Sequence, residues 1–197
     1  DPGADNSGYV VWNEQAGLYE VFTRRVSADR RIALSTSPDL KQFSPSITVL
    51  QPDAQDRLGT EFYEMPVRAY EDMFLGLLKI QTVDRFEERR MKRTGRIETE
   101  LAYSYNGLHW YRPVREPFLG LRDYGKLGSG QASGMEILRT PDDKLLFYAH
   151  SSEGEHAFYR DMQAAGMDTT GVFGPLLYEM RLDGFCSLKT WGREGVL

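Results

Sequence analysis

A hairpin followed by a turn-bearing strand occurs three times in the sequence, and this repeat constrains the fold more than any other feature. The turn-bearing stretches read IALSTSPDLKQFSPS (32–46), ELAYSYNGLHWYRPV (100–114) and, more faintly, LLYEMRLDGFCSL (176–188). The hairpins before them lie at 10–25, 67–81 and 136–152. Apolar and polar residues alternate with a period of two, which predicts strands. Each repeat supplies four antiparallel strands, the make-up of a β-propeller blade.

The repeat therefore predicts an all-β propeller, of which about three blades are present. Solenoid repeats are shorter, and an immunoglobulin-like sandwich would not restart its pattern three times. Because propellers close with about four to eight blades, we expect further blades outside this sequence. The sequence begins without a methionine or a signal peptide, so we also expect a missing upstream segment, and no localisation is assigned. The predicted blades span approximately 5–55, 58–120 and 128–190, and 191–197 would begin a linker.

Several local structures are predicted with the blades. Segments 84–93 and 156–167 each predict a short helix, the second ended by Gly166. The turns at 37–40, 105–108 and 182–185 are expected at equivalent places in their blades, with the type I′ geometry that Asn-Gly and Asp-Gly favour. Trp110, which follows the second turn, is expected to pack between blades.

Composition excludes several classes of function. The net charge of −5 argues against a nucleic-acid partner, because such proteins carry a basic face. No apolar run approaches the roughly 18 residues of a membrane-spanning helix, so no membrane partner is predicted. The single cysteine, Cys186, excludes an internal disulfide and a cysteine-based zinc cluster. Three scattered histidines and the absence of a P-loop ending predict neither a metal nor a cofactor.

Several stretches are similar to a known group of proteins. They are DNSGYVVWNEQAGLYEVFTR (5–24), IALSTSPDLKQFS (32–44), LAYSYNGLHWYRPVREPFL (101–119) and MRLDGFCSL (180–188). In this order they resemble the five-bladed propeller superfamily of glycoside hydrolases that includes families 32 and 43, and more closely an uncharacterised family-32-like branch. The resemblance implies a carbohydrate-active five-bladed propeller with an oligosaccharide or glycoside substrate. It also implies that REGVL (193–197) leads into a C-terminal β-sandwich.

Candidate catalytic residues follow from the propeller topology. Innermost strands from different blades converge on a channel, and glycoside hydrolysis needs two carboxylates on either side of the scissile bond. Asp5, Glu61 and Glu64 stand near the starts of inner strands. Glu64 is predicted as the general acid, because apolar Met65 would raise its pKa and Glu-Met-Pro resembles the Glu-Cys-Pro stretch of family 32. Asp5 would be the nucleophile or base, although a terminal Asp5 could equally be solvated chain.

Substrate contacts are expected from Trp12, Tyr63, Arg24 and Glu136. Aromatic rings stack on the CH faces of sugars, and Trp12 and Tyr63 lie on or beside inner strands. Glu136 begins the inner strand of the third blade, where a structural role is the alternative.

One basic tract and one missing motif leave several activities open. The tract comprises Arg85, Arg89, Arg90, Lys92, Arg93 and Arg96. It alternates with glutamates, which favours a salt-bridged exposed excursion over a lid that holds a phosphate or a uronate carboxylate. An Arg-Asp-Pro motif, which supplies the transition-state stabiliser in family 32, is absent. The alternatives to a hydrolase are therefore a non-catalytic carbohydrate-binding propeller, a glycoside phosphorylase and a structural scaffold.

Overall fold

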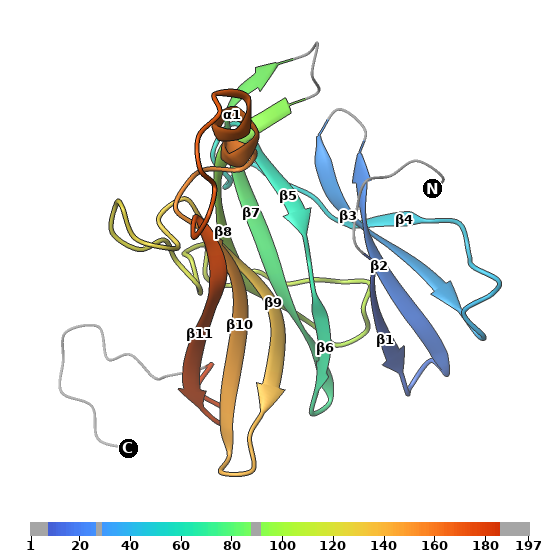
Figure 1. The fold of residues 1–197 in the computed structure, drawn as a ribbon. Coiled ribbons are helices and arrows are strands. Elements are labelled where there is room, and N and C mark those ends of the chain that lie inside the picture. The colour runs from blue at the N-terminus through green and yellow to red at the C-terminus, as the bar shows by residue number, and fades with distance from the viewer. Residues whose placement is uncertain (1–7, 27–28, 88–91, 186–197) are drawn as a thin grey trace.

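Strands make up most of the structure, a computed structural model that describes residues 8–26, 29–87 and 92–185. Figure 1 shows three groups of strands side by side, coloured blue, cyan to green, and orange to red along the chain. The prediction of an all-β architecture is confirmed, whereas the number of blades stays a prediction. In the described part of the chain, no helix is long and apolar enough to cross a membrane.

The first group is a four-stranded antiparallel sheet in the order β1-β2-β3-β4. Its strands are Tyr9–Asn13, Leu18–Val26, Arg30–Ser37 and Ile47–Leu50. Alternation in β2 turns Glu20, Phe22 and Arg24 to one buried face, and alternation in β3 turns Arg30, Ile32 and Leu34 inward in the same way. Each inward row is apolar in the middle and ends on an arginine.

The second and third groups are joined in one sheet, in the order β11-β10-β9-β8-β7-β5, with β6 paired to β7. The strands are β5 (Thr60–Glu64), β6 (Val67–Tyr70), β7 (Met73–Glu87), β8 (Lys92–Ser104), β9 (Gln131–Arg139), β10 (Lys144–Ser152) and β11 (Phe173–Arg181). The link between the groups is one parallel pairing, Ile97 with Gln131. The repeat predicts three separate four-stranded sheets, and this join is the difference.

The second group also lacks a regular fourth strand. Its outer edge consists of two isolated bridges, which pair Tyr103 with Tyr111 and Thr99 with Leu119. Strands β1–β4, β5–β8 and β9–β11 fall within the ranges 5–55, 58–120 and 128–190. The division into blades at those boundaries stays a prediction, and the expected linker at 191–197 lies outside the described residues.

The two predicted helices have different outcomes. Helix α1 (Phe158–Ala164) forms within 156–167, and Gly166 follows it with a φ of 69°. The helix predicted over 84–93 is wrong, because β7 runs to Glu87 and β8 begins at Lys92. Cross-strand pairing such as Arg85 with Thr94 extends the hairpin through this charged stretch. Figure 1 shows α1 beside the end of this hairpin.

The predicted turns come after β3, β8 and β11, each the third strand of its group when β5 and β6 are counted together. In the first two, a Ser-x-Asx sequence forms the turn. The carboxylate of Asp39 accepts hydrogen bonds from the backbone N–H groups of Lys41 and Gln42. The amide oxygen of Asn106 accepts in the same way from those of Leu108 and His109.

The predicted type I′ geometry of these turns is wrong. Only Leu40 in the first and Gly107 in the second have positive φ, whereas type I′ needs two such residues. In the third turn the residue with positive φ is Asp183, one place earlier relative to the strand end.

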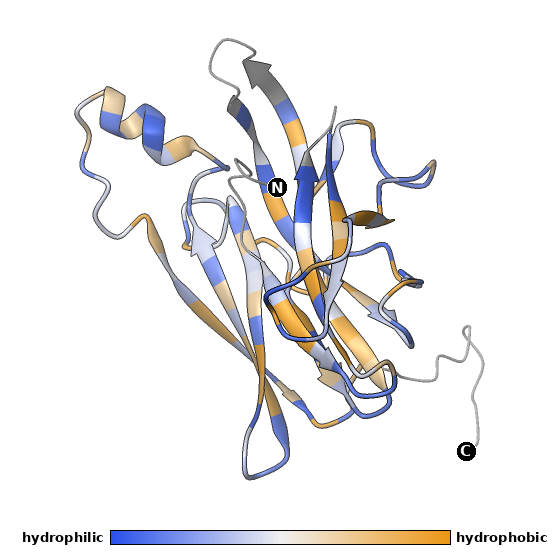
Figure 2. Cartoon of the chain, turned by 90° about the vertical axis from the view of Figure 1, so that its right-hand side faces the viewer, coloured by the Kyte–Doolittle hydropathy of each residue, from blue (hydrophilic) through white to orange (hydrophobic). Residues whose placement is uncertain are grey.

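Two apolar clusters lie on either side of the second group. Residues Phe62, Met65, Phe74 and Leu78 pack against the first sheet, and Leu75 and Leu77 pack against β9 and β10. Trp110 packs with the first cluster at 5.5 Å from the ring of Phe22, so its predicted place between strand groups is confirmed. Figure 2 shows the apolar residues, in orange, concentrated along the strands. The polar ends of the inward rows are thereby left to form a cavity.

Candidate functional site

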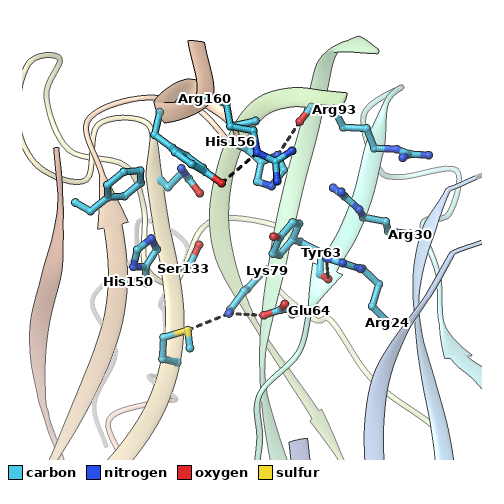
Figure 3. A pocket seen from close by; sticks show the side chains of 15 residues that line it. Arg24, Arg30, Tyr63, Glu64, Lys79, Arg93, Ser133, His150, His156 and Arg160 are labelled. Carbon is cyan, nitrogen blue, oxygen red and sulfur yellow. Dashed lines mark hydrogen bonds and ion pairs between the residues drawn. The ribbon is translucent and has the colours of Figure 1, made fainter. Parts of the chain in front are cut away.

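A cavity of about 480 Å³ lies where the three strand groups meet near α1. The described lining comes from β2, β3, β5, β7, β8, β9, β10, α1, β11 and the loop before α1 (Figure 3). The lining residues are Arg24, Arg30, Tyr63, Glu64, Lys79, Arg93, Gln131, Ser133, Met135, His150, His156, Ala157, Tyr159, Arg160 and Phe173. Of the predicted site residues, Arg24, Tyr63 and Glu64 share this cavity.

A β-bulge in β5 explains why the neighbours Tyr63 and Glu64 both face the cavity. Phe62 pairs with Ile80 and Glu64 pairs with Lys79, so Tyr63 is the extra residue. Regular pairing would place Glu64 opposite Leu78, a residue of the apolar core. The inserted residue instead turns Glu64 to the face of Lys79, and bulges re-aim side chains in this way.

The Glu64 carboxylate is held by two donors at the base of the cavity. Lys79 Nζ lies 2.9 Å from its Oε2 atom, and the Tyr9 hydroxyl donates to the same oxygen at 2.9 Å. Lys79 is almost fully buried and also lies 3.1 Å from the Met135 sulfur. Burial has the largest influence on the pKa of Glu64 and raises it, but the charge and hydrogen bond of Lys79, with the Tyr9 hydroxyl, lower it further. The net pKa of Glu64 lies below its ordinary value.

This environment corrects the reason given for Glu64 as a general acid. Met65 is buried in the apolar core beside Phe62, away from the cavity lining, and so it does not desolvate the carboxylate on the cavity side. A carboxyl with a lowered pKa is ionised at neutral pH, and an ionised carboxylate suits a base or a nucleophile.

Glu61 lies behind the cavity wall. Its Oε1 atom accepts a hydrogen bond from Arg93 Nε at 2.8 Å, and its Oε2 atom lies 3.7 Å from Arg30 Nη1. The described lining of the cavity does not include Glu61. The structure therefore places Glu61 as a counter-ion that fixes two arginines, while a direct catalytic role stays a prediction.

Tyr63 supports two guanidinium groups. The Cζ atoms of Arg24 and Arg30 lie 4.8 Å and 4.9 Å from the centre of its ring, within the range of cation–π attraction. Arg24 Nη1 also donates to the Tyr63 carbonyl at 3.4 Å. The edge-on contact of Tyr63 with His156, at 5.0 Å between ring centres, completes this packing. The ring that is predicted to stack on a sugar thus has cationic neighbours.

Two histidines line the cavity as neutral groups at neutral pH. Burial lowers the pKa of His156, and the charges of Arg30, Arg160 and Arg24 lower it further. Its Nδ1 atom lies 2.7 Å from the Arg93 carbonyl oxygen, which can only accept, so Nδ1 carries the proton and Nε2 is an acceptor. Burial, followed by the charge of Lys79, likewise lowers the pKa of His150, which stacks on Phe173.

The remaining predicted site residues are not brought to this cavity. Trp12 lines a separate groove of about 630 Å³ beside β6, where it is 46% exposed. Glu136 lies in a third pocket and forms an ion pair with Arg68 at 2.5 Å. Asp5 lies outside the described residues.

Sequence reasoning missed Arg30, Lys79, Arg93 as a site residue, Arg160 and His156. Arg30 could have been found, because it continues the period-two row of Ile32 and Leu34. Lys79 could also have been found as the lone charge within the apolar run FLGLLKI (74–80). His156 carried no local signal, because the contact of its loop with β8 joins segments far apart in the sequence.

No group of His, Cys, Asp and Glu side chains in the described residues has an arrangement suited to a metal ion. Lysine, arginine and neutral histidine dominate the cavity instead, and of these only histidine is a metal ligand. The arrangement is therefore suited to hydrogen bonding and ionic recognition.

Comparisons with known proteins agree on the fold. The sequence matches no family model and no curated protein. The structure resembles a solved structure described as a glycoside hydrolase, with 11% identity, a TM-score of 0.59 and coverage of 96% of this chain and 49% of that chain. It also resembles a solved complex of BT0996 with RGII, with 12% identity, a TM-score of 0.56 and coverage of 93% and 47%. The chain spans about half the length of these structures, with which it shares a glycosidase-like fold.

Proposed function

We propose that this chain forms part of a carbohydrate-active protein that acts on glycosides, in a five-bladed propeller similar to families 32 and 43. The single observation that carries this is the ionised, doubly held Glu64 in a cavity shared by all three strand groups. The likeness of the fold to a structure described as a glycoside hydrolase supports a saccharide as the ligand.

Within this proposal Glu64 is the base or nucleophile. Glycosidases pair such a carboxylate with a carboxylic acid on the other side of the bond. Asp5 stays the proposed partner, now as the acid, because the lowered pKa of Glu64 suits the other role. Arg24 is the proposed contact to substrate, and Trp12 and Glu136 are proposed contacts for parts of a longer saccharide that extend beyond the cavity.

A non-catalytic carbohydrate-binding protein is the second candidate. The observation that favours it is that Glu64 is the one carboxylate among the described lining residues. With a single carboxylate, the cavity could bind sugar hydroxyls through Glu64, His156 and Gln131 without cleaving a bond.

The test is cleavage of a panel of aryl glycosides and oligosaccharides by the wild-type protein and by Glu64→Gln. We expect the variant to lose about 10²–10⁴ in kcat, the range for acid–base catalysis. Glu179→Gln is the matched control, because Glu179 is an exposed carboxylate on β11 that pairs with Lys144 away from the cavity. A loss below about tenfold in Glu64→Gln would reject the catalytic role. Saturable sugar binding without any turnover would select the binding protein instead.

A further inference from the structure

The cavity lining carries a large excess of positive charge. Among its described residues it holds five cationic side chains, Arg24, Arg30, Lys79, Arg93 and Arg160, against the single carboxylate of Glu64. Adding Glu61 behind the wall still leaves five cations against two carboxylates. This excess stands out in a chain whose net charge is −5, and neutral sugar hydroxyls do not require it.

Three of these arginines are buried, so their mutual repulsion is poorly screened by water. Arg24, Arg30 and Arg93 are 7%, 8% and 8% exposed. Burial, together with the charge of Arg24, lowers the pKa of Arg30 to about 10. Removing like charges from water is destabilising unless opposite charge compensates them. A bound anion would add such compensation to the whole group.

The arginines are also held in fixed positions. Arg24 and Arg30 both lie against the ring of Tyr63, and the ion pair with Glu61 fixes Arg93. Figure 3 shows these three arginines on one side of the cavity, across from His150 and Ser133. Arg160 enters from α1, where its Nε atom donates to the Tyr159 hydroxyl at 3.1 Å. Fixed guanidinium groups lose little freedom when they bind an oxyanion, and they favour two-point contacts.

We propose that this cavity binds an oxyanion, either a sugar carboxylate or inorganic phosphate, through Arg24, Arg30 and Arg160. The proposal rests on the proposed function in that the anion is either part of the saccharide or bound beside it. Lys79 is left out of the binding group because Glu64 engages its ammonium. His156 is left out because its Nε2 atom is an acceptor.

The test is isothermal titration calorimetry of the protein with four ligands at constant ionic strength in chloride. These are inorganic phosphate, glucuronate, galacturonate and neutral glucose. We expect saturable binding of phosphate or of a uronate at least tenfold tighter than that of glucose. The tighter of the two classes identifies the source of the anion. Equal, non-saturable heats for all four ligands would overturn the proposal.

Variants separate this site from general charge effects. Arg24→Gln should weaken binding of the preferred anion at least tenfold, and Glu64→Gln should tighten it, because a negative charge beside the site is removed. Arg160→Gln should weaken binding severalfold, and since Arg160 is exposed on α1, this variant keeps the test valid if Arg24→Gln fails to fold. Arg139→Gln removes an exposed cation that pairs with Asp143 outside the cavity, and should change affinity less than twofold.

Unchanged affinity in the folded arginine variants would overturn the proposal. Since binding is measured without turnover, this result is independent of whether Glu64→Gln affects glycoside cleavage. An anion site with no cleavage would contradict only the catalytic function, and cleavage with no anion site would contradict only this inference.

Discussion

At the residue scale, the inward arginines show which parts of the site follow from the sequence. Arg24 and Arg30 continue rows of alternating apolar residues, so their direction follows from strand geometry alone. The direction of Glu64 does not, because it depends on one extra residue in β5 that no alternation announces. Topology predicts Glu61 and Trp12 at the channel, yet Glu61 is turned to Arg93 and Trp12 to another groove.

His156 predicts how stability depends on pH. Its folded pKa lies below the ordinary value of 6.5, so the unfolded state takes up the proton more readily. Stability is therefore lost as pH falls from about 6.5 towards the folded pKa. His150 acts in the same direction. We expect the melting temperature to be lower at pH 5 than at pH 7.5.

His156→Gln should reduce this pH dependence, because glutamine keeps a donor for the Arg93 carbonyl but does not titrate. His109→Gln is the control, because His109 lies in the exposed turn after β8. An identical difference in melting temperature between pH 5 and pH 7.5 for His156→Gln and wild type would contradict this account.

At the scale of elements, local turns were more predictable than the contacts between strand groups. The turns after β3 and β8 lie where the sequence predicts them, because Ser-x-Asx sequences satisfy their own backbone donors. The parallel join of β8 to β9 could not be read from local patterns, since Ile97 and Gln131 are distant in the chain and pair only after both strands exist. The helix predicted over 84–93 failed for the related reason that the pairing of β7 with β8 overrides helix propensity.

Asn106 provides a test of the turn after β8. Its side-chain oxygen accepts hydrogen bonds from two backbone N–H groups, at 3.0 and 2.9 Å. Asn106→Ala should lower the free energy of unfolding by about 1 kcal/mol, a typical value for such bonds. Asn106→Asp keeps the acceptor and should retain most of the stability. Urea denaturation measures both variants, and equal losses in the two would contradict the role of the acceptor.

At the scale of the whole molecule, the outer face of β9, β10 and β11 is apolar. Leu138, Tyr148 and Leu177 are 42%, 42% and 55% exposed, and Tyr148 pairs across the strands with Leu177. Exposed apolar patches of this kind favour association.

We expect the 197-residue chain to associate as its concentration rises, and light scattering would measure this. The double variant Leu138→Lys/Leu177→Lys places charges on the patch and should shift the protein towards monomer. Gln163→Lys is the control, because it adds a positive charge at an exposed position of α1, away from the patch. A wild-type protein that stays monomeric at all concentrations would contradict the prediction.

The bulge at Tyr63 has a consequence for comparing this chain with its relatives. A relative with a regular strand in place of β5 contains one residue fewer between the positions of Phe62 and Glu64. Its alignment with this sequence must therefore open a one-residue gap at Tyr63. Without that gap, Glu64 would be matched to a core-facing position, and a carboxylate shared by both proteins would be scored as a difference.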